Sequence, residues 1–376
     1  MTEPTRAQHD ARMATLVLSA LALAIIGVLI QVAVDSPRAP VAFQRALRQV
    51  VYVVAAGGLA WGAYWYGHKR AIRLAPWGLY ATWILLAVLL IPGMPKRGGA
   101  TRWIDLGPVN MQPSELAKLA LVLFVTHFAE KKGQTFGTVR QGLMPALGYV
   151  AVTCGLVLLE PDLGQTVLLL ALASVMMVIN GAAIRNFMVL IGIGIPLLVA
   201  FMGSKWEYVR GRIESYLGEG SYQVQQGLIF FSEGGALGTG IGQGRSQLFV
   251  PEIHNDFAMV AVAEQTGFFG ALCVIGLFLA LSWSGFRIAL AAKERGSFSV
   301  AFGATFMIAL QACINISVVT GSIPPKGMSI PFLSFGGSSL LMLGLAIGLI
   351  LSVARENALA ASPVNATGAL PEGAAA

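Results

Sequence analysis

The sequence predicts an all-α integral membrane protein, a polytopic bundle of about ten transmembrane helices. Of the 376 residues, 56% are hydrophobic and only 11% are charged, whereas an ordinary soluble domain carries about 25% charged residues. Apolar stretches with roughly the 20-residue length of a membrane-spanning helix recur along the chain. We predict spans at 13–34, 46–66, 76–93, 114–130, 142–159, 163–181, 186–203, 257–283, 299–320 and 337–354.

These spans are predicted to form one membrane domain, residues 1–356. The remaining tail, 357–376, is rich in Ala, Pro and Gly and has no apolar periodicity, so we expect it to be disordered and cytoplasmic. Two segments between spans are long, 94–113 and 204–256. We expect these two segments to carry the chemistry, the second as a long extracellular loop between spans seven and eight.

The charge balance bears on partners and orientation. The formal net charge is +7, and the basic residues are scattered through loops, which suits anionic lipid head groups and argues against nucleic acid as a partner. With a cytoplasmic N-terminus, 13 of the 25 Lys and Arg residues fall inside and 12 outside, so the raw count does not decide. Setting aside the eight outer residues in or beside the two long segments leaves 13 against 4, which favours cytoplasmic N- and C-termini.

No metal centre or nucleotide site is predicted. The three cysteines lie in apolar stretches without C-x-x-C spacing, and no His and carboxylate spacing resembles a zinc site. The glycine-rich segment 234–244 matches neither G-x-G-x-x-G nor a Walker loop. We expect a flexible re-entrant loop there rather than a nucleotide cradle.

Charged residues at the edge of a span are informative because burying them is costly. Glu115 and Lys118 open the fourth span with i, i+3 spacing, so they share a helix face and can form an ion pair. The alternative is a glutamate at a helix N-terminus and a lysine extending to the interface. Upstream, Arg102 offers a planar guanidinium that suits phosphate.

Asp256 is the strongest single candidate for catalysis. It lies immediately before a long span, in the segment Pro251–Phe257. Partial burial would raise its pKa toward a value useful in a general base, and the alternative is a plain N-cap. For Glu160 and Asp162, in a tight external turn, both turn chemistry and a cation or hydroxyl site stay open.

At this point the motifs closely resemble those of the SEDS family (shape, elongation, division and sporulation), the ten-span peptidoglycan polymerases. The resemblance runs from about 98 to 339. It rests on Gly99–Ile104 with Gln112–Lys118, and on Pro161–Gly164, Tyr222–Gln226, Gly234–Gly240, Pro251–Phe257 and Pro331–Ser339.

Details of the motifs lean toward one branch of the family. The segment Ile323–Gly327 resembles the Pro-x-Lys-Gly of the FtsW branch, where the RodA branch usually lacks the lysine. Two positions depart from the common pattern: Asn255 stands where threonine is usual, and Glu264-Gln265 replaces a Glu-Glu pair.

The resemblance implies a glycosyltransferase that polymerises lipid II at the outer face of the bacterial cytoplasmic membrane, in cell division if the FtsW lean holds. The products are a β-1,4-linked glycan and undecaprenyl pyrophosphate. Asp256 would accept the proton of the acceptor hydroxyl. Arg102 and Lys118 would bind the leaving pyrophosphate, with Glu115 holding Lys118. Further candidates for substrate contacts are Gln112, Asp162, Arg210, Arg212, Glu252, Lys326 and Ser338.

The resemblance also implies partners. Family members work with a class B penicillin-binding protein, the transpeptidase that crosslinks the new glycan. A divalent cation, Mg²⁺ or Mn²⁺, could assist the leaving group, although the sequence shows no dedicated cage. Three alternatives stay open: a RodA-like polymerase of cell elongation, a lipid II flippase, and an inactive scaffold of the division machinery.

Overall fold

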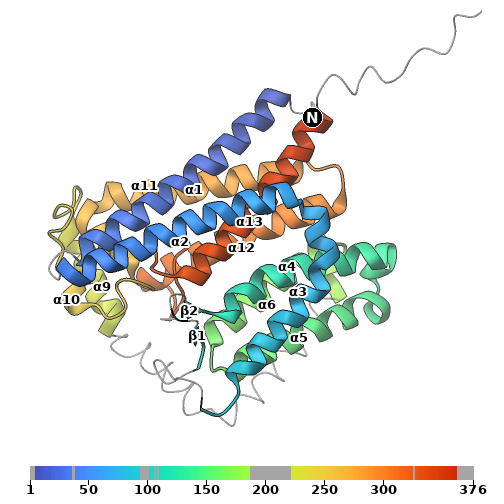
Figure 1. Ribbon diagram of the computed structural model, residues 1–376, viewed down its shortest axis with the longest axis horizontal. Helices are drawn as coiled ribbons and strands as arrows, with labels where there is room; N and C mark the ends of the chain where they lie inside the picture. Colours follow the sequence, from blue (N-terminus) through green and yellow to red (C-terminus); the bar gives the residue numbers. More distant parts are fainter. Residues whose placement is uncertain are drawn as a thin grey trace, which may run out of the picture.

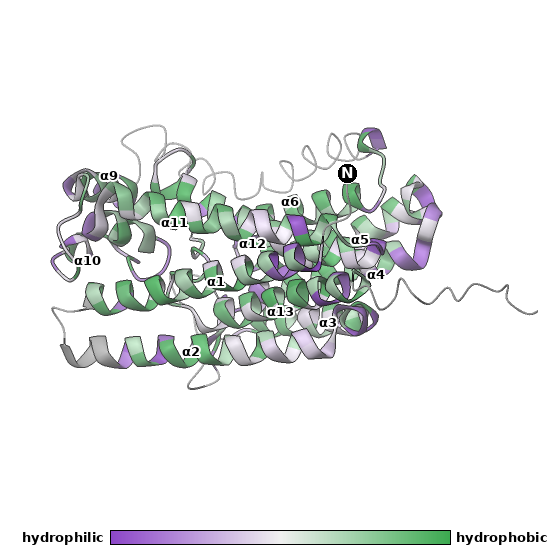
Figure 2. Ribbon diagram, turned by 90° about the horizontal axis from the view of Figure 1, so that it is seen from above, coloured by the Kyte–Doolittle hydropathy of each residue, from purple (hydrophilic) through white to green (hydrophobic). Residues whose placement is uncertain are grey.

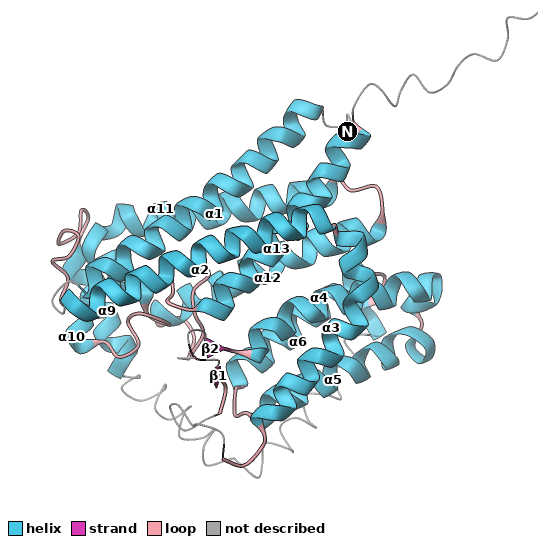
Figure 3. Ribbon diagram, viewed as in Figure 1, coloured by secondary structure: helices cyan, strands magenta, loops and turns pink. Residues whose placement is uncertain are grey.

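The computed structural model describes residues 5–35, 39–93, 101–105, 107, 110–186, 222–324 and 327–361, and this part of the chain is predominantly helical (Figure 3). Its helices in chain order are α1 (Arg6–Asp35), α2 (Ala39–Tyr66), α3 (His68–Leu89), α4 (Pro113–Lys132), α5 (Met144–Leu159), α6 (Leu163–Ile179), α9 (Tyr222–Gly234), α10 (Ser246–Phe249), α11 (Ala258–Leu290), α12 (Arg295–Val319) and α13 (Gly337–Ala360). A 3-10 turn (Gly133–Gly137) and a π turn (Val139–Leu143) precede α5. Strands β1 (Ile104–Asp105) and β2 (Asn110–Met111) form a short antiparallel hairpin.

Seven helices of the described chain are long and apolar enough to cross a membrane. Figure 2 shows hydrophobic residues predominating along α1 and α11. Nine of the ten predicted spans coincide with described helices, and the seventh, 186–203, lies outside the described residues from 187 onward. The predicted all-α polytopic bundle is therefore confirmed.

The start of the third predicted span is wrong. We placed it at Pro76, but α3 begins at His68 and carries Pro76 inside the helix. A proline there removes the backbone N–H that would bond to the carbonyl of Ile72, four residues earlier. The side chain of His127 in α4 hydrogen-bonds to the backbone of Ile72 instead, so a contact between helices compensates for the interruption.

Helices α2 and α13 pack closely along their length, and Figure 1 shows them side by side. The contact depends on small residues. A Cβ atom added to Gly344 would stand 2.3 Å from the carbonyl oxygen of Ala56, and one added to Gly348 would stand 2.3 Å from that of Ala60. Glycine at these positions lets the two backbones approach, as in many membrane helix pairs.

Helix α13 ends later than predicted. The domain was expected to end at 356, yet α13 continues to Ala360. The side chain of Asn357 is buried and donates to the carbonyl of Ile288 over 2.9 Å, which ties the last turn of α13 to the end of α11. Most of the predicted tail, from 362, lies outside the described residues.

Helix α11 is also longer than its predicted span, 257–283, and is interrupted at Gly267. The backbone of Gly267 has φ 69° and ψ −167°, which is not helical. The N–H groups of Phe268 and Phe269, just after the break, donate to the carbonyls of Gly235 and Ala236. The interruption therefore fastens the glycine-rich loop to α11 by backbone hydrogen bonds.

Candidate active site

Asp256 lies in a loop, 250–257, that joins α10 to α11 and is fixed by side chains from distant helices. Gln31 of α1 donates to the carbonyl of His254 over 2.9 Å. Asn315 of α12 donates to the carbonyl of Asp256 over 2.8 Å, and the hydroxyl of Ser334 donates to the loop as well. Three separate parts of the fold thus determine where the aspartate stands.

The side chain of Asp256 does not cap α11. The helix begins at Ala258, its N-cap residue is Phe257, and no side chain caps it. Asp256 is partly exposed, and no described residue hydrogen-bonds to its carboxylate. A Cβ atom at Gly327 would stand 3.0 Å from Oδ2, so glycine there leaves room beside the carboxylate. The N-cap alternative is therefore not supported by the structure.

The surroundings of Asp256 favour a proton acceptor. The pKa of Asp256 is raised to about 7, mainly by burial and in part by the nearby charges of Glu252 and Asp162, while Arg102 opposes the shift. A base with a pKa near the working pH combines a substantial deprotonated fraction with useful basicity. These electrostatic effects also show that the structure brings Arg102, Asp162 and Glu252 near Asp256.

Arg102 stands just before the β1–β2 hairpin and reaches the turn between α5 and α6. Its Nε is 3.6 Å from Oδ2 of Asp162, and its guanidinium donates to the carbonyls of Glu160 and Pro161. The side chain is 26% exposed, so part of the guanidinium remains accessible. The turn therefore holds Arg102 in place, and the exposed part of its guanidinium presents positive charge to the solvent side of the turn.

Asp162 serves the turn in two ways. Its Oδ1 accepts from the backbone N–H of Gln165 over 3.2 Å, which caps α6, and its Oδ2 faces Arg102. Burial raises the pKa of Asp162, and Arg102 opposes this shift. Asp162 therefore both stabilises the turn by capping α6 and lies beside the cation of Arg102.

Glu160, in the same turn, is 1% exposed, and neither carboxylate oxygen has a hydrogen-bond partner in the described chain. Burial, together with the charge of Asp162, raises the pKa of Glu160 to about 8. A buried carboxyl without a partner is more stable in its neutral form. Near neutral pH, Glu160 is therefore mainly protonated, and Asp162 is the acidic group that faces Arg102.

Glu115 and Lys118 form the predicted ion pair, with Nζ 2.8 Å from Oε1. Lys118 also donates to Gln311 of α12 over 2.6 Å, and Gln165 of α6 donates to Glu115 over 3.1 Å. Lys118 is only 1% exposed, so it does not extend to the interface. The ion pair connects three helices: Lys118 joins α4 to α12, and Glu115 joins α4 to α6.

The remaining predicted residues are less closely tied to this group. Gln112 stands at the N-cap position of α4, and its side chain makes no cap hydrogen bond. Glu252 is exposed, has a left-handed backbone (φ 57°) and accepts from Asn255 over 2.7 Å. Ser338 is buried in the first turn of α13, where its hydroxyl has no partner among the described residues. Arg210, Arg212 and Lys326 lie outside the described residues.

Sequence reasoning did not assign a role to Glu264. Glu264 is completely buried on α11, and its carboxylate accepts from the backbone N–H groups of Arg245 and Ser246. The neighbouring Gln265 accepts from the N–H of Gly242 over 2.9 Å. The glycine-rich loop, expected to be flexible, has a defined set of hydrogen bonds to α11. The N–H groups of Gly242 in this loop, and of Arg245 and Ser246 directly after it, therefore have acceptors on α11.

Gln165, Gln311 and Asn315 were also missed. Gln165 lies in α6, and Gln311 and Asn315 lie one turn apart in α12. Each of these amides joins helices or loops around the site. Polar side chains inside spans are costly to bury without partners, and that signal could have marked all three. For metals, the described residues contain no group of three or more His, Cys, Asp or Glu residues that could hold an ion.

Comparison with known proteins identifies relatives across most of the chain. The FtsW/RodA/SpoVE family of cell cycle proteins matches residues 13–359. Stage V sporulation protein E of Bacillus subtilis is 40% identical over 280 residues, which cover 72% of this chain and 76% of that protein. The protein named "Probable peptidoglycan glycosyltransferase FtsW" of Geobacter sulfurreducens is 32% identical, over 90% of this chain and 94% of its own.

Solved structures with the same fold include the rod shape determining protein RodA of Thermus thermophilus, with a TM-score of 0.66 and 27% identity over 91% of this chain and 96% of that one. A structure described as "Structural coordination of polymerization and crosslinking by a peptidoglycan synthase complex" has a TM-score of 0.74 and 29% identity, over 91% of this chain and 97% of its own. The apolar helices, the site and these matches together show that the chain is a multi-pass membrane protein that belongs to the FtsW/RodA/SpoVE family.

Proposed function

We propose that this chain is a peptidoglycan glycosyltransferase that polymerises lipid II into β-1,4-linked glycan at the outer face of the bacterial cytoplasmic membrane. Relatives across 90% of the chain are named as peptidoglycan glycosyltransferases. The observation that carries the proposal is the position of Asp256. Hydrogen bonds from Gln31, Asn315 and Ser334 fix its loop, while no described residue hydrogen-bonds to its carboxylate. Such a carboxylate is available to a substrate hydroxyl.

The proposed reaction is a single inverting displacement. The 4-hydroxyl of the acceptor sugar attacks C1 of the donor sugar, which is α-linked to a pyrophosphate, and the new bond has β configuration. The C1–O bond to the pyrophosphate breaks with its electron pair, and undecaprenyl pyrophosphate leaves. Asp256 accepts the proton of the attacking hydroxyl, a contribution that is typically about 10²- to 10⁴-fold in rate.

The two predicted cations have different surroundings, and we assign them different roles. Arg102 is partly exposed beside Asp162, so we place it next to the departing pyrophosphate, where positive charge stabilises the developing negative charge. Lys118 is buried, with Glu115 and Gln311 as its partners, and we assign it the role of positioning α4 against α12. Arg210, Arg212 and Lys326 stay candidates for the leaving group from the sequence alone.

Contacts with the sugars and lipid are proposed for the other motif residues. Glu252 is exposed and Gln112 is partly exposed, and the buried hydroxyl of Ser338 has no hydrogen-bond partner among the described residues. Asp162 orients Arg102 in this scheme. A divalent cation could assist the pyrophosphate, but no step above depends on one.

We further propose that the partner is a class B penicillin-binding protein and that the termini are cytoplasmic. The similar structure described as a complex of polymerization and crosslinking supports such a partner. The FtsW-named relatives support a role in septal wall synthesis, and imaging a tagged protein tests it. A septal signal supports the division role, and a lateral one assigns the chain to elongation.

The decisive test of activity uses the purified full-length protein in liposomes with lipid II, alone and with its transpeptidase partner. We expect glycan strands together with the release of one undecaprenyl pyrophosphate for each glycosidic bond formed. If no glycan forms under either condition while lipid II crosses the bilayer, the protein is a flippase. If neither occurs, the scaffold alternative replaces the proposal.

A further inference from the structure

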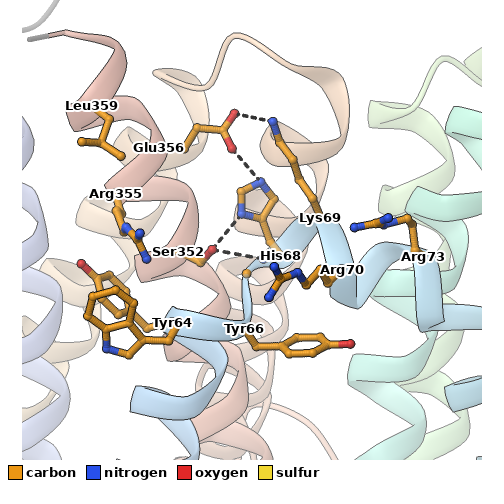
Figure 4. Close-up of a pocket in the computed structure, with 12 residues that line it drawn as sticks. Tyr64, Tyr66, His68, Lys69, Arg70, Arg73, Ser352, Arg355, Glu356 and Leu359 are labelled. Atoms are coloured by element: carbon orange, nitrogen blue, oxygen red, sulfur yellow. Dashed lines mark hydrogen bonds and ion pairs between the residues drawn. The ribbon is translucent and has the colours of Figure 1, made fainter.

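A second site lies at the opposite end of the bundle from Asp256, where α2 turns into α3 beside the last turns of α13 (Figure 4). A pocket of about 420 Å³ opens there. Four basic side chains line it, Lys69, Arg70, Arg73 and Arg355, against the single carboxylate of Glu356. The pocket therefore has an excess of positive charge.

The carboxylate compensates only one of these cations. Glu356 lies 3.0 Å from Nζ of Lys69, and Lys69 also pairs with Glu294 over 2.8 Å. The three arginines form no ion pair with any residue in the described ranges. Their charges remain available to an anion from outside the protein.

Aromatic rings hold two of the arginines in place. The guanidinium of Arg355 lies 4.6 Å from the ring centre of Trp65 and 5.4 Å from that of Tyr64. That of Arg70 lies 5.9 Å from the ring of Tyr66. Stacking uses the flat face of a guanidinium and leaves the N–H groups on its edge free to bind a phosphate.

The floor of the pocket is rigid because His68 joins three elements. Its ring nitrogens lie 2.9 Å from the hydroxyls of Ser352 in α13 and Ser297 in α12, and its backbone N–H donates to Ser352 as well. Figure 4 shows Glu356, His68 and Ser352 linked in a row, with Arg355 on one side and Lys69 and Arg73 on the other. The backbone that carries the basic side chains is therefore held in place by these hydrogen bonds.

An apolar groove adjoins the pocket. It has a volume of about 500 Å³, runs between α1, α2 and α13, and shares Tyr64 and Trp65 with the basic pocket. Its other lining residues are almost all apolar, among them Val17, Leu21 and Ile347. A basic pocket that continues into an apolar groove matches a molecule with an anionic head and a hydrocarbon tail.

We propose that this pocket binds the phosphodiester head group of an anionic membrane phospholipid, with an acyl chain in the adjoining groove. The charge excess selects an anion, the edge N–H groups of Arg70 and Arg355 suit phosphate oxygens, and the groove favours a lipid over a free phosphate. Tyr64 and Trp65 stand between the two, a position that amphipathic rings favour at the membrane interface.

The test measures phospholipid binding to the full-length protein in detergent by native mass spectrometry, with phosphatidylglycerol and phosphatidylcholine as probes. We expect wild type to retain phosphatidylglycerol in preference to phosphatidylcholine. The double variant Arg70→Gln/Arg73→Gln should bind phosphatidylglycerol about 25-fold more weakly, since each basic residue near an anionic lipid contributes about 5-fold.

The matched control is Lys131→Gln/Arg140→Gln, which removes two cations at the same end of the bundle but outside the pocket. It should bind as wild type does. If the first double variant fails to fold, Arg355→Gln is used, with an expected loss of about 5-fold. Equal binding of both lipids, unchanged binding by the pocket variants, or displacement of the lipid by excess inorganic phosphate would overturn the proposal.

Discussion

Two carboxylates eight residues apart, on either side of the start of α11, have opposite surroundings. Glu264 is completely buried, and its oxygens accept from the N–H groups of Arg245 and Ser246. Asp256 is partly exposed, and no described residue donates to its carboxylate. An ionised carboxylate can only accept hydrogen bonds. A carboxylate whose oxygens already accept from the protein stabilises the structure, whereas a carboxylate without protein donors can accept a proton from a substrate.

The first prediction concerns Asp256. Asp256→Asn removes the proton acceptor but keeps the size of the side chain, so glycan formation should fall about 10²- to 10⁴-fold. The melting temperature should not fall, because the hydrogen bond that Asp256 makes comes from its backbone carbonyl and its raised pKa shows that the charged side chain does not stabilise the fold. Polymerisation of lipid II and thermal unfolding are measured in parallel, with Asp10→Asn, an exposed aspartate of α1, as the control.

The second prediction concerns the buried ion pair. Lys118→Met leaves the carboxylate of Glu115 buried without its cation, and breaking such a pair from one side costs about 3–5 kcal/mol. Chemical denaturation in detergent measures the loss. Lys131→Met, an exposed lysine of the same helix, should have almost no effect, and comparable losses in the two variants would argue against the positioning role of Lys118.

The third prediction separates Glu264 from Asp256 by its effect on stability. Glu264→Ala leaves the backbone N–H groups of Arg245 and Ser246 without an acceptor, at about 1–3 kcal/mol for each unsatisfied group. Glu264→Gln keeps one acceptor oxygen and should lose less. Thermal unfolding ranks the two variants against Glu233→Ala, and an unchanged melting temperature for Glu264→Ala would contradict the assignment.

The fourth prediction concerns the accessible cation. Arg102→Lys keeps the charge but loses the planar guanidinium that bonds to the turn at Glu160 and Pro161. We expect polymerisation to fall about tenfold, the loss of one charge-assisted hydrogen bond. Arg245→Lys, an exposed arginine directly after the glycine-rich segment and at the same end of the molecule, is the matched control. An equal loss in both variants would remove Arg102 from the site.

The contrast between the two carboxylates marks what the sequence could predict. Apolar stretches located nine of the eleven described α-helices and missed α9 and α10, which lie in the segment expected to be a loop. The motif around Asp256 located the open carboxylate, because this signal is local as well. The role of Glu264 was missed because its partners, Arg245 and Ser246, come from a loop that folds back onto α11. Gln311 was missed for the same reason, since its partner Lys118 is 193 residues away.

Local sequence patterns also could not predict two further features, the interruption of α11 at Gly267 and the position of Pro76 inside α3. In each case a group from another segment hydrogen-bonds to the backbone of the interrupted helix. Carbonyls of the glycine-rich loop accept from the N–H groups after Gly267, and His127 bonds to the backbone of Ile72. Propensity alone places helix boundaries at such residues. Only the packed fold shows that the interruptions are compensated.

The pH dependence of polymerisation tests the central claim, that Asp256 is an open base, most directly. Burial raises its pKa to about 7, and only the deprotonated form accepts a proton, so the rate should be full above about pH 8 and fall roughly tenfold per unit well below pH 7. The residual rate of Asp256→Asn should lack this acid limb. A wild-type rate that stays constant down to about pH 5, or the same acid limb in the variant, would contradict the account.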